Sequence, residues 1–210
     1  MIRQVSVLAT ALAMAGAAPA LAQQGPAADP AARQALDAYG RCVAERKPQE
    51  SQRVLAQDFR SSAYRTGLRM LSDDAERNCA KAAVGQKGAM RSSNLLFAGA
   101  VAENLIEQGV EPVNVRLAMA VNAKADTFGP TDALAQCLAR SLPDQVAALF
   151  AAGPASEEEL AASAPLFSAI APCSQAAGIE NRIEMSLPAM RAMLATAALR
   201  LISKSENPDA

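Results

Sequence analysis

The sequence predicts an all-α protein that is a tandem duplication of a module of roughly four helices, each module closed by one disulfide bond. Three observations lead to this prediction. The chain is rich in Ala and Leu and only 3% aromatic, a composition that favours helices. Apolar residues recur at helical spacing along most of its length. One segment with conserved spacing of cysteine, proline and serine occurs twice.

The two copies of this segment are displaced by 95 residues, and no gap is needed to align them. The matching positions are Asp37, Cys42, Pro48 and Ser61 in the first copy, and Asp132, Cys137, Pro143 and Ser156 in the second. Each copy supplies a further cysteine, Cys79 or Cys173, 37 or 36 residues after its first. The repeat therefore predicts module 1 at residues 29–110, a linker at 111–128 and module 2 at 129–204.

The helices expected in module 1 span residues 30–45, 48–57, 63–82 and 93–108. Asp29 and Ser93 are of the residue types that cap helix N-termini, and Pro30 suits the first helical position. In the third helix an apolar stripe at helical spacing leads to Cys79, so a disulfide would join this helix to the first. Gly109 is expected to end the fourth helix.

The linker and module 2 are read in the same way. Residues 111–126 alternate like a strand but could also form a helix that begins at Pro112, and both interpretations remain open. Further helices are expected from Thr131 as N-cap, from Pro143, over residues 156–173 and over residues 187–203. The run from Ser156 to Glu159 has the capping-box pattern. Candidate core residues of that helix are Leu160, Phe167 and Ile170.

Residues 1–22 have the pattern of a secretory signal peptide. Arg3 precedes a short apolar run, and the run ends in a small-residue cleavage site at Ala20 to Ala22. An uncleaved membrane anchor is the alternative, but it would need about 20 apolar residues. No later run is apolar and long enough to cross a membrane. The chain is therefore expected in the periplasm or outside the cell.

An exported chain with an even number of cysteines is expected to form disulfides. The repeat selects the pairing Cys42–Cys79 and Cys137–Cys173. A zinc site or a redox pair is the alternative, but the close cysteine pairs typical of such sites are absent from the sequence.

The absence of histidine from the whole chain excludes several classes of function. It removes Ser–His and Cys–His catalysis and histidine ligation of metals. The sequence has no Gly-rich phosphate loop and no catalytic serine motif. The few aromatic residues argue against a nucleic-acid platform that stacks bases. We expect no cofactor and no bound metal.

Charge is distributed unevenly. Residues 29–91 carry 12 Lys or Arg against 8 Asp or Glu, whereas residues 92–210 carry 7 against 13. Four arginines of module 1 are candidates for contact with an acidic envelope protein or polymer: Arg41, Arg46, Arg53 and Arg60. They could equally be the polar faces of amphipathic helices.

At Cys137, Pro143, Ser156, Cys173 and the run from Arg191 to Ala195, the sequence resembles a family of uncharacterised exported proteins of Gram-negative bacteria. The resemblance implies a two-repeat helical protein and implies no activity. Module 1 departs from the family pattern, because Ala98 takes the position of the arginine. No role of this arginine is therefore expected to be common to both copies.

Three hypotheses follow. The first is a non-enzymatic binding protein of the cell envelope, motivated by duplication, export and missing catalytic motifs. The second is a carrier of an apolar small molecule in a groove between the modules. The third is a hydrolase that uses carboxylates or a Ser/Lys pair, which would require a buried acid of raised pKa in a cleft.

Overall fold

The structure, a computed structural model, describes residues 29–79, 92–180 and 183–208. Within these ranges the chain forms ten α-helices and one 3₁₀ helix, with no strand, so the all-α prediction is confirmed. The expected signal peptide at residues 1–22 and the expected end of the third helix beyond residue 79 lie outside the described ranges.

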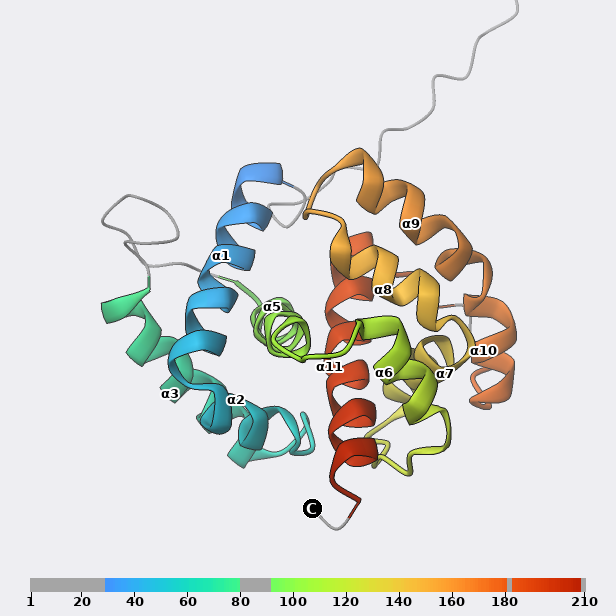
Figure 1. Ribbon diagram of the computed structural model, residues 1–210, viewed down its shortest axis with the longest axis horizontal. Helices are drawn as coiled ribbons and strands as arrows, with labels where there is room; N and C mark the ends of the chain where they lie inside the picture. Colours follow the sequence, from blue (N-terminus) through green and yellow to red (C-terminus); the bar gives the residue numbers. More distant parts are fainter. Residues whose placement is uncertain (1–28, 80–91, 181–182, 209–210) are drawn as a thin grey trace, which may run out of the picture.

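Two buried helices form the centre of the molecule: α5 (Asn94–Glu107) and α11 (Leu187–Glu206). Both are apolar around most of their circumference, as expected for helices enclosed by others. They pack directly on each other, with α5 nearly end-on beside α11 in Figure 1. They approach each other closely at Gly99, where a Cβ atom would lie 2.4 Å from Cα of Ala192. Small residues at this point bring the two helix backbones together.

The first half of the molecule (residues 29–110) packs three helices around α5. These are α1 (Pro30–Arg46), α2 (Pro48–Leu55) and α3 (Ser62–Asn78), which lie together on one side in Figure 1. Helix α1 approaches α5 closely at Gly40, where a Cβ atom would lie 2.6 Å from the backbone of Ala100. The expected apolar stripe of α3 is buried, with Tyr64, Leu68 and Leu71 in the core.

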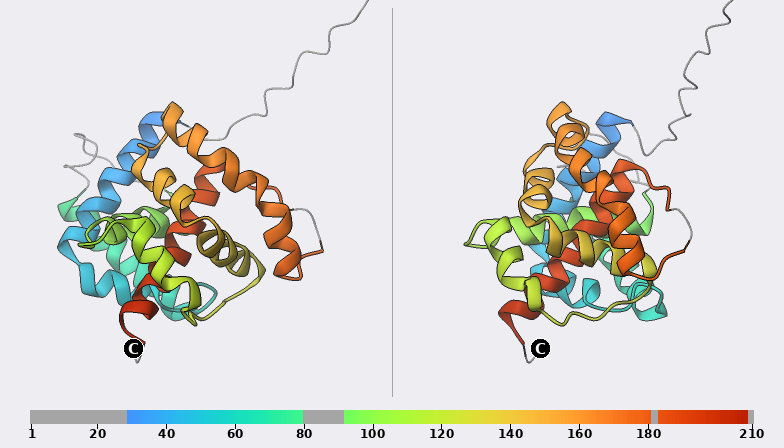
Figure 2. Two further views of the ribbon diagram at one scale, coloured as in Figure 1. Left: turned by 45° about the vertical axis from the view of Figure 1, so that its right-hand side comes forward. Right: turned by 90° about the vertical axis from the view of Figure 1, so that its right-hand side faces the viewer.

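The second half (residues 111–208) surrounds α11 with short helices. The elements are α6 (Val113–Met119), η2 (Ala120–Asn122), α7 (Pro130–Ser141), α8 (Pro143–Ala151), α9 (Glu157–Ser168) and α10 (Ile170–Ala176). Of residues 111–126, whose conformation the sequence left open, 113–122 are helical and 123–126 have no regular secondary structure. Leu117 is buried, and α6 packs on α8 and α11. Helices α9 and α10 lie on the outside of this half (Figures 1 and 2).

Each half contains one disulfide bond, with the pairing expected from the repeat. Cys42 on α1 is joined to Cys79, which follows α3, and the two Cα atoms are 5.7 Å apart. Cys137 on α7 is joined to Cys173 on α10, with a Cα separation of 5.6 Å. The described residues contain no free cysteine. Each bond joins a cysteine on a helix of its half, α1 or α7, to a cysteine 37 or 36 residues later in the chain.

Several expected helix boundaries are confirmed by hydrogen bonds. The Asp29 side chain accepts from the amide of Ala31 at 3.0 Å, and Ser93 accepts from the amide of Leu96 at 3.3 Å. Thr131 was expected to cap α7, and this prediction is wrong. The helix begins one residue earlier, at Pro130 after Gly129. Proline is preorganised for the first helical position, which places Thr131 inside the helix.

The expected single helix over residues 156–173 is wrong as well. It is two helices, α9 and α10, separated at Ala169. Pro172 explains the break. It has no amide proton to donate to the carbonyl of Ser168, four residues earlier, and its ring would clash with that carbonyl. Pro172 is instead accommodated in the first turn of α10.

The expected core face of α9 is also wrong for two residues. Leu160 is 65% exposed and Phe167 is 36% exposed, whereas Glu159, Ser163 and Leu166 face the interior. The helix is rotated so that a glutamate, rather than the nearby leucine, points inward. The partners of Glu159 supply the reason.

Candidate functional site

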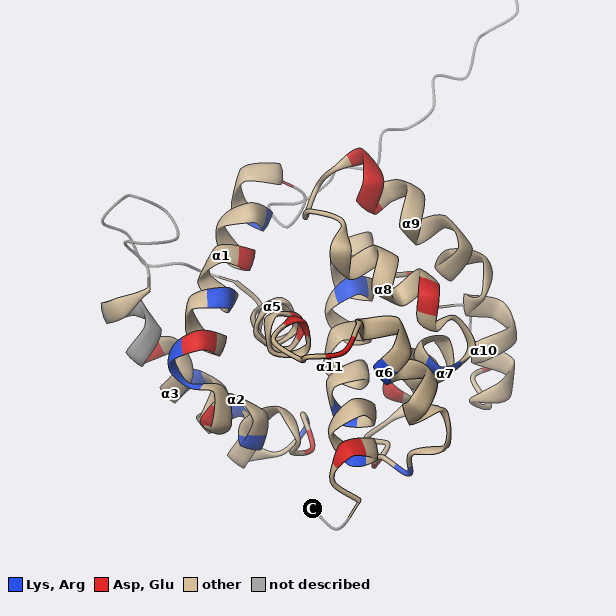
Figure 3. Ribbon diagram, viewed as in Figure 1, with Lys and Arg blue, Asp and Glu red and all other residues tan. Residues whose placement is uncertain are grey.

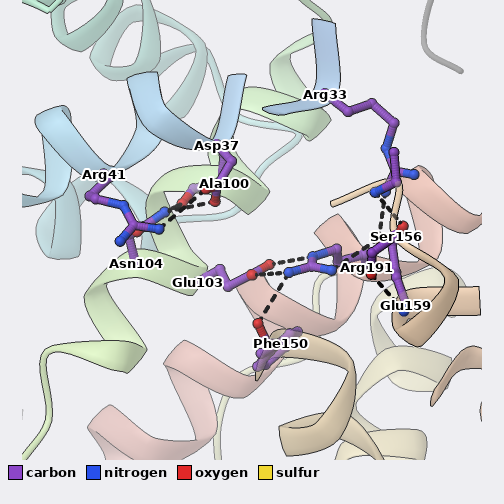
Figure 4. A network of polar contacts seen from close by, with 11 residues as sticks. Arg33, Asp37, Arg41, Ala100, Glu103, Asn104, Phe150, Ser156, Glu159 and Arg191 are labelled. Atoms are coloured by element: carbon purple, nitrogen blue, oxygen red, sulfur yellow. Dashed lines mark hydrogen bonds and ion pairs between the residues drawn. The ribbon is translucent and has the colours of Figure 1, made fainter. Parts of the chain in front are cut away.

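A network of buried ion pairs joins the two halves at the end of the molecule where α1, α5, α9 and α11 meet. Its members are Arg33 on α1, Glu103 on α5, Glu159 on α9 and Arg191 on α11 (Figure 4). The side chains of Glu103, Glu159 and Arg191 are at most 7% exposed. Charges withdrawn from water to this extent are tolerated only when they are paired and hydrogen-bonded.

Arg191 lies at the centre of the network. Its Nε donates to Oε2 of Glu103 at 2.9 Å, and its Nη2 donates to Oε1 of the same carboxylate. Its Nη1 donates to Oε1 of Glu159 at 3.0 Å, and Nη2 also donates to the carbonyl of Phe150 at 3.2 Å. The bidentate pair with Glu103 is the geometry for which the guanidinium fork is suited. One arginine thus connects α5 in the first half to α8 and α9 in the second.

Glu159 receives hydrogen bonds from both halves. Arg33 Nη2 donates to its Oε1 at 2.5 Å, and the amide of Ala155 donates to its Oε2 at 2.9 Å. The capping box predicted here is half right. The Ser156 hydroxyl accepts from the amide of Glu159 at 3.1 Å, but the Glu159 carboxylate binds Ala155 and the two arginines instead of reaching the Ser156 amide. These contacts fix the rotation of α9 and leave Leu160 outside.

The pKa values of the two carboxylates, Glu103 and Glu159, are shifted in opposite directions. Burial raises the pKa of Glu103 to about 7, although the hydrogen bond from Arg191 acts in the other direction. Burial also acts to raise the pKa of Glu159, but the hydrogen bonds from Arg33 and Ala155 outweigh it and lower this pKa below its ordinary value. The pKa of Arg191 is raised, because its bonds to the two glutamates outweigh the effect of burial.

A cavity of about 50 Å³ adjoins this network and is bordered by Arg33, Asp37, Glu103 and Arg191. Glu103 is therefore a buried acid of raised pKa beside a cavity, the feature that the hydrolase hypothesis requires. The cavity, however, has room for only a few water molecules. The described residues that line it include no hydroxyl or thiol nucleophile. Chemically, the arrangement can hold two helix pairs together and exchange a proton at Glu103.

A larger hollow lies on the second half, between α9, α10 and residues 179–180 and 183–185; we call it the α9–α10 groove. Its volume is about 830 Å³. Apolar side chains line it, among them Phe167, Ile170, Ile179, Ile183 and Met185. Beyond the first turn of α9, neither α9 nor α10 carries a charged residue (Figure 3). The groove is within the size range of small-molecule sites and has the apolar lining that such sites share.

A buried hydroxyl adds a polar group to the groove. Ser174 lines the groove, is 9% exposed, and its Oγ has no hydrogen-bond partner. A buried polar atom without a partner carries a free-energy cost of about 1–3 kcal/mol. A bound molecule with a hydroxyl or carbonyl group would remove this cost. Gln175 and the carboxylates of Glu180 and Glu184 also border the groove.

The four arginines expected to contact a partner are all exposed on the first half. Arg41 pairs with Asp37 at 3.3 Å, and Arg53 donates to the carbonyl of Gln49 at 3.4 Å. Arg60 is paired with Asp58 at 3.0 Å, which raises the pKa of Arg60 and lowers that of Asp58. They lie on α1, on α2 and in the turn after α2, and none borders a cavity described above. Partner binding by these arginines stays a prediction.

The described ranges contain no cluster of three or more Cys, Asp or Glu side chains placed to hold a metal ion. Over the same part of the chain, no helix is long and apolar enough to cross a membrane.

Sequence reasoning missed the ion-pair network, but the sequence contains a signal that could have found part of it. Glu103 and Arg191 are isolated charges within apolar helical segments. A lone charge on a helix that is otherwise apolar all round must be buried with a partner. The identity of the partner is not readable, because Glu103 and Arg191 are 88 residues apart.

Comparison with protein-family models, with curated proteins and with solved structures found no match to this chain. The functional proposal therefore stands on the geometry of the groove and of the network.

Proposed function

We propose that the protein is a non-enzymatic binding protein whose ligand is an apolar small molecule held in the α9–α10 groove. The observation that carries the proposal is the apolar groove of about 830 Å³ with the buried, unpartnered hydroxyl of Ser174 in its wall. The ligand has an apolar body and one hydrogen-bonding group. It carries no negative charge, because Glu180 and Glu184 border the groove.

This location differs from the groove between the modules that the sequence analysis considered. The walls of the α9–α10 groove all come from the second half. The rotation of α9 helps to form this groove. Because Glu159 faces the core, Phe167 lies at the surface, where it lines the groove.

The use of the buried charges supports binding rather than catalysis. Glu103 and Glu159 are both engaged by arginines, and the adjoining cavity has room for only a few water molecules. A general acid or base must reach its substrate within hydrogen-bond distance. Turnover of an ester, amide or glycoside by the purified protein, lost in the Glu103→Gln variant, would favour the hydrolase hypothesis instead.

The proposal places the protein in the periplasm or outside the cell. Two disulfides are typical of proteins in oxidising compartments. The predicted signal peptide at residues 1–22 is the second argument.

We further propose that the two halves arose by duplication of one module. Local geometry supports this proposal at equivalent positions. Lys47 and Leu142, each just before the proline that starts the second helix, have φ, ψ angles of −133°, 48° and −135°, 54°. Ser61 and Ser156 each accept a hydrogen bond from the amide three residues later, at 3.0 and 3.1 Å.

Titration with Nile red, an uncharged apolar dye, tests the proposed ligand class. Wild-type protein is expected to bind the dye with saturable enhancement of fluorescence. Ala171→Trp should weaken this binding at least about tenfold, because the new ring fills the groove that Ala171 lines. Ala161→Trp is the matched control, since Ala161 is exposed on α9 but does not line the groove.

Equal binding by the wild type and by Ala171→Trp would contradict the proposed site. Native mass spectrometry of protein purified from its own cells then identifies the natural ligand. A bound mass that is present in the wild type and in Ala161→Trp but lost in Ala171→Trp is the supporting result.

A further inference from the structure

A second cavity, of about 240 Å³, lies where the two halves meet at the end of α11; we call it the seam cavity. One wall comes from the first half, with Gln52 on α2 and Ala56 directly after it. The opposite walls are residues 124–126 and the last turns of α11. The seam cavity shares no described lining residue with the α9–α10 groove and does not depend on the function proposed for it.

Positive charge predominates in the seam cavity. Lys124, Arg200 and Lys204 line it from two different segments, and Asp126 is the one carboxylate among its described lining residues. The three cations are brought together in a part of the chain that is acidic overall, with 13 Asp or Glu against 7 Lys or Arg from residue 92 onward. Concentrated positive charge in a hollow favours a negatively charged ligand.

The side chain of Arg200 is held in one orientation in this wall by contacts with its neighbours. Its side chain is 7% exposed, and its Nη2 donates to Oδ1 of Asp132. Its guanidinium lies 5.0 Å from the centre of the Phe128 ring. Asp132 is itself held by the amide of Phe128 at 2.9 Å. These contacts fix the orientation of the guanidinium before any ligand arrives.

The hydrogen-bonding capacity of Arg200 is not exhausted by these contacts. Its Nε is buried and has no partner. A buried, unpartnered donor on a charged group is costly, and a bound ion or water is one way to satisfy it. Arg200 is paired with Asp132, and the other charged residues that line the cavity are Lys124, Lys204 and Asp126.

We propose that the seam cavity binds the phosphate or carboxylate group of a small organic anion. The ammonium groups of Lys124 and Lys204 bind the oxyanion, and the preoriented Arg200 adds positive charge behind it. The polar side chains of Gln52, Ser203 and Asn207 border the space that the rest of the molecule occupies. Because α2 and α11 belong to different halves, the bound anion bridges them and stabilises their contact.

Nuclear magnetic resonance titration of the full mature chain with glycerol 3-phosphate and with succinate tests the proposal. Sodium chloride is adjusted so that the ionic strength stays constant, which removes general screening effects. Saturable shifts of the amides of residues 124–126 and 199–204 are expected with at least one of the two compounds. The Lys124→Gln, Lys204→Gln double variant should bind at least about tenfold more weakly.

Arg46→Gln is the matched control, because Arg46 is an exposed cation outside the seam cavity. It should bind as the wild type does. Equal binding by the double variant and the control would overturn the proposal. The double variant alters side chains on the wall of the cavity and leaves the buried Arg200–Asp132 pair intact, so it is expected to fold.

A second arm distinguishes a soluble anion from a lipid headgroup of the same chemistry. Vesicles of phosphatidylglycerol are compared with vesicles of phosphatidylcholine in a sedimentation assay. Binding to phosphatidylglycerol vesicles that the double variant loses, without binding of the soluble compounds, assigns the site to a lipid headgroup. Binding of a soluble compound assigns it to a free anion, and binding in neither arm overturns the proposal.

Discussion

The two halves of the molecule share their framework but differ at the residues that face each other. Ser93 caps α5 and Ser186 caps α11, and each helix reaches the contact between halves five to six residues later. There the first half has Ala98 and Gly99, whereas the second has Arg191 and Ala192. At equivalent positions, α5 thus presents a small apolar residue, and α11 presents the central arginine of the ion-pair network.

The outer faces of the halves differ as well. On α3 the exposed residues include Arg65 and Arg69, whereas on α9 they include Leu160, Ala164 and Phe167. This contrast has an internal cause. In α9 the inward glutamate sets the rotation of the helix, and apolar residues consequently reach the surface. An apolar groove can therefore result from a buried charge that lies outside it.

Loss of the central arginine should have the largest effect. Arg191→Met leaves Glu103 and Glu159 buried without their shared partner, and we expect the free energy of unfolding to fall by about 3–5 kcal/mol. Urea unfolding at pH 7 measures it. Arg46→Met is the control and should change stability by less than about 0.5 kcal/mol, because Arg46 is exposed.

Adding Glu103→Gln to Arg191→Met should restore part of the loss, since the stranded carboxylate becomes neutral. A loss below about 1 kcal/mol in Arg191→Met would show that the network contributes little, and that the halves are joined mainly by the apolar contact at Gly99.

The disulfides test whether the two halves depend equally on covalent closure. Replacing Cys42 and Cys79 by Ala, or Cys137 and Cys173 by Ala, should each cost about 2–5 kcal/mol. The closed loops span 37 and 36 residues, so the chain-entropy model predicts nearly equal losses. Thermal unfolding of the two variants provides the comparison. A difference above about 2 kcal/mol would mean that the folded halves, rather than the unfolded loops, decide the effect.

The equivalent aspartates Asp37 and Asp132 offer a finer comparison. Asp132 is buried against Arg200, so Asp132→Asn should cost about 2–3 kcal/mol by leaving that charge unbalanced. Asp37 is only partly buried and accepts from Asn104 at 3.3 Å, so Asp37→Asn should cost about 0.5–1.5 kcal/mol. The two variants are compared by urea unfolding. Equal losses would argue against a special role of the Arg200 pair.

The pH dependence distinguishes the two glutamates that share Arg191. The folded pKa of Glu103, about 7, lies above the ordinary value of 4.5, so the folded state binds the proton more tightly. Stability should therefore fall as pH rises from about 4.5 to about 7, by at most about 2 kcal/mol between pH 5 and 7. Glu159 has a lowered pKa, so its contribution is present above 4.5 and is lost as pH falls below that value.

Urea midpoints at pH 5, 6, 7 and 8 measure this dependence. In Glu103→Gln the decline between pH 5 and 7 should disappear, while the loss of stability in acid remains. An unchanged slope in this variant would assign the dependence to another group, such as Glu107, whose pKa burial also raises.

Much of the fold could be predicted from local signals. Asp29 and Ser93 cap the helices they were expected to cap, and the prolines at residues 48 and 143 begin helices. The break between α9 and α10 was readable in principle from Pro172. The candidate site was not predicted, because its groove depends on which face of α9 is buried, and apolar periodicity alone favours Leu160 over Glu159.

The sequence by itself determined the helical class, most helix ends and the cysteine pairing, because these follow from neighbouring residues and from a repeat visible in the chain. Only the tertiary structure decided which charges meet. Arg33 lies 126 residues from Glu159, and Glu103 lies 88 residues from Arg191. Their pairing depends on how α1, α5, α9 and α11 pack, and the free energy of burying a charge then makes that packing specific.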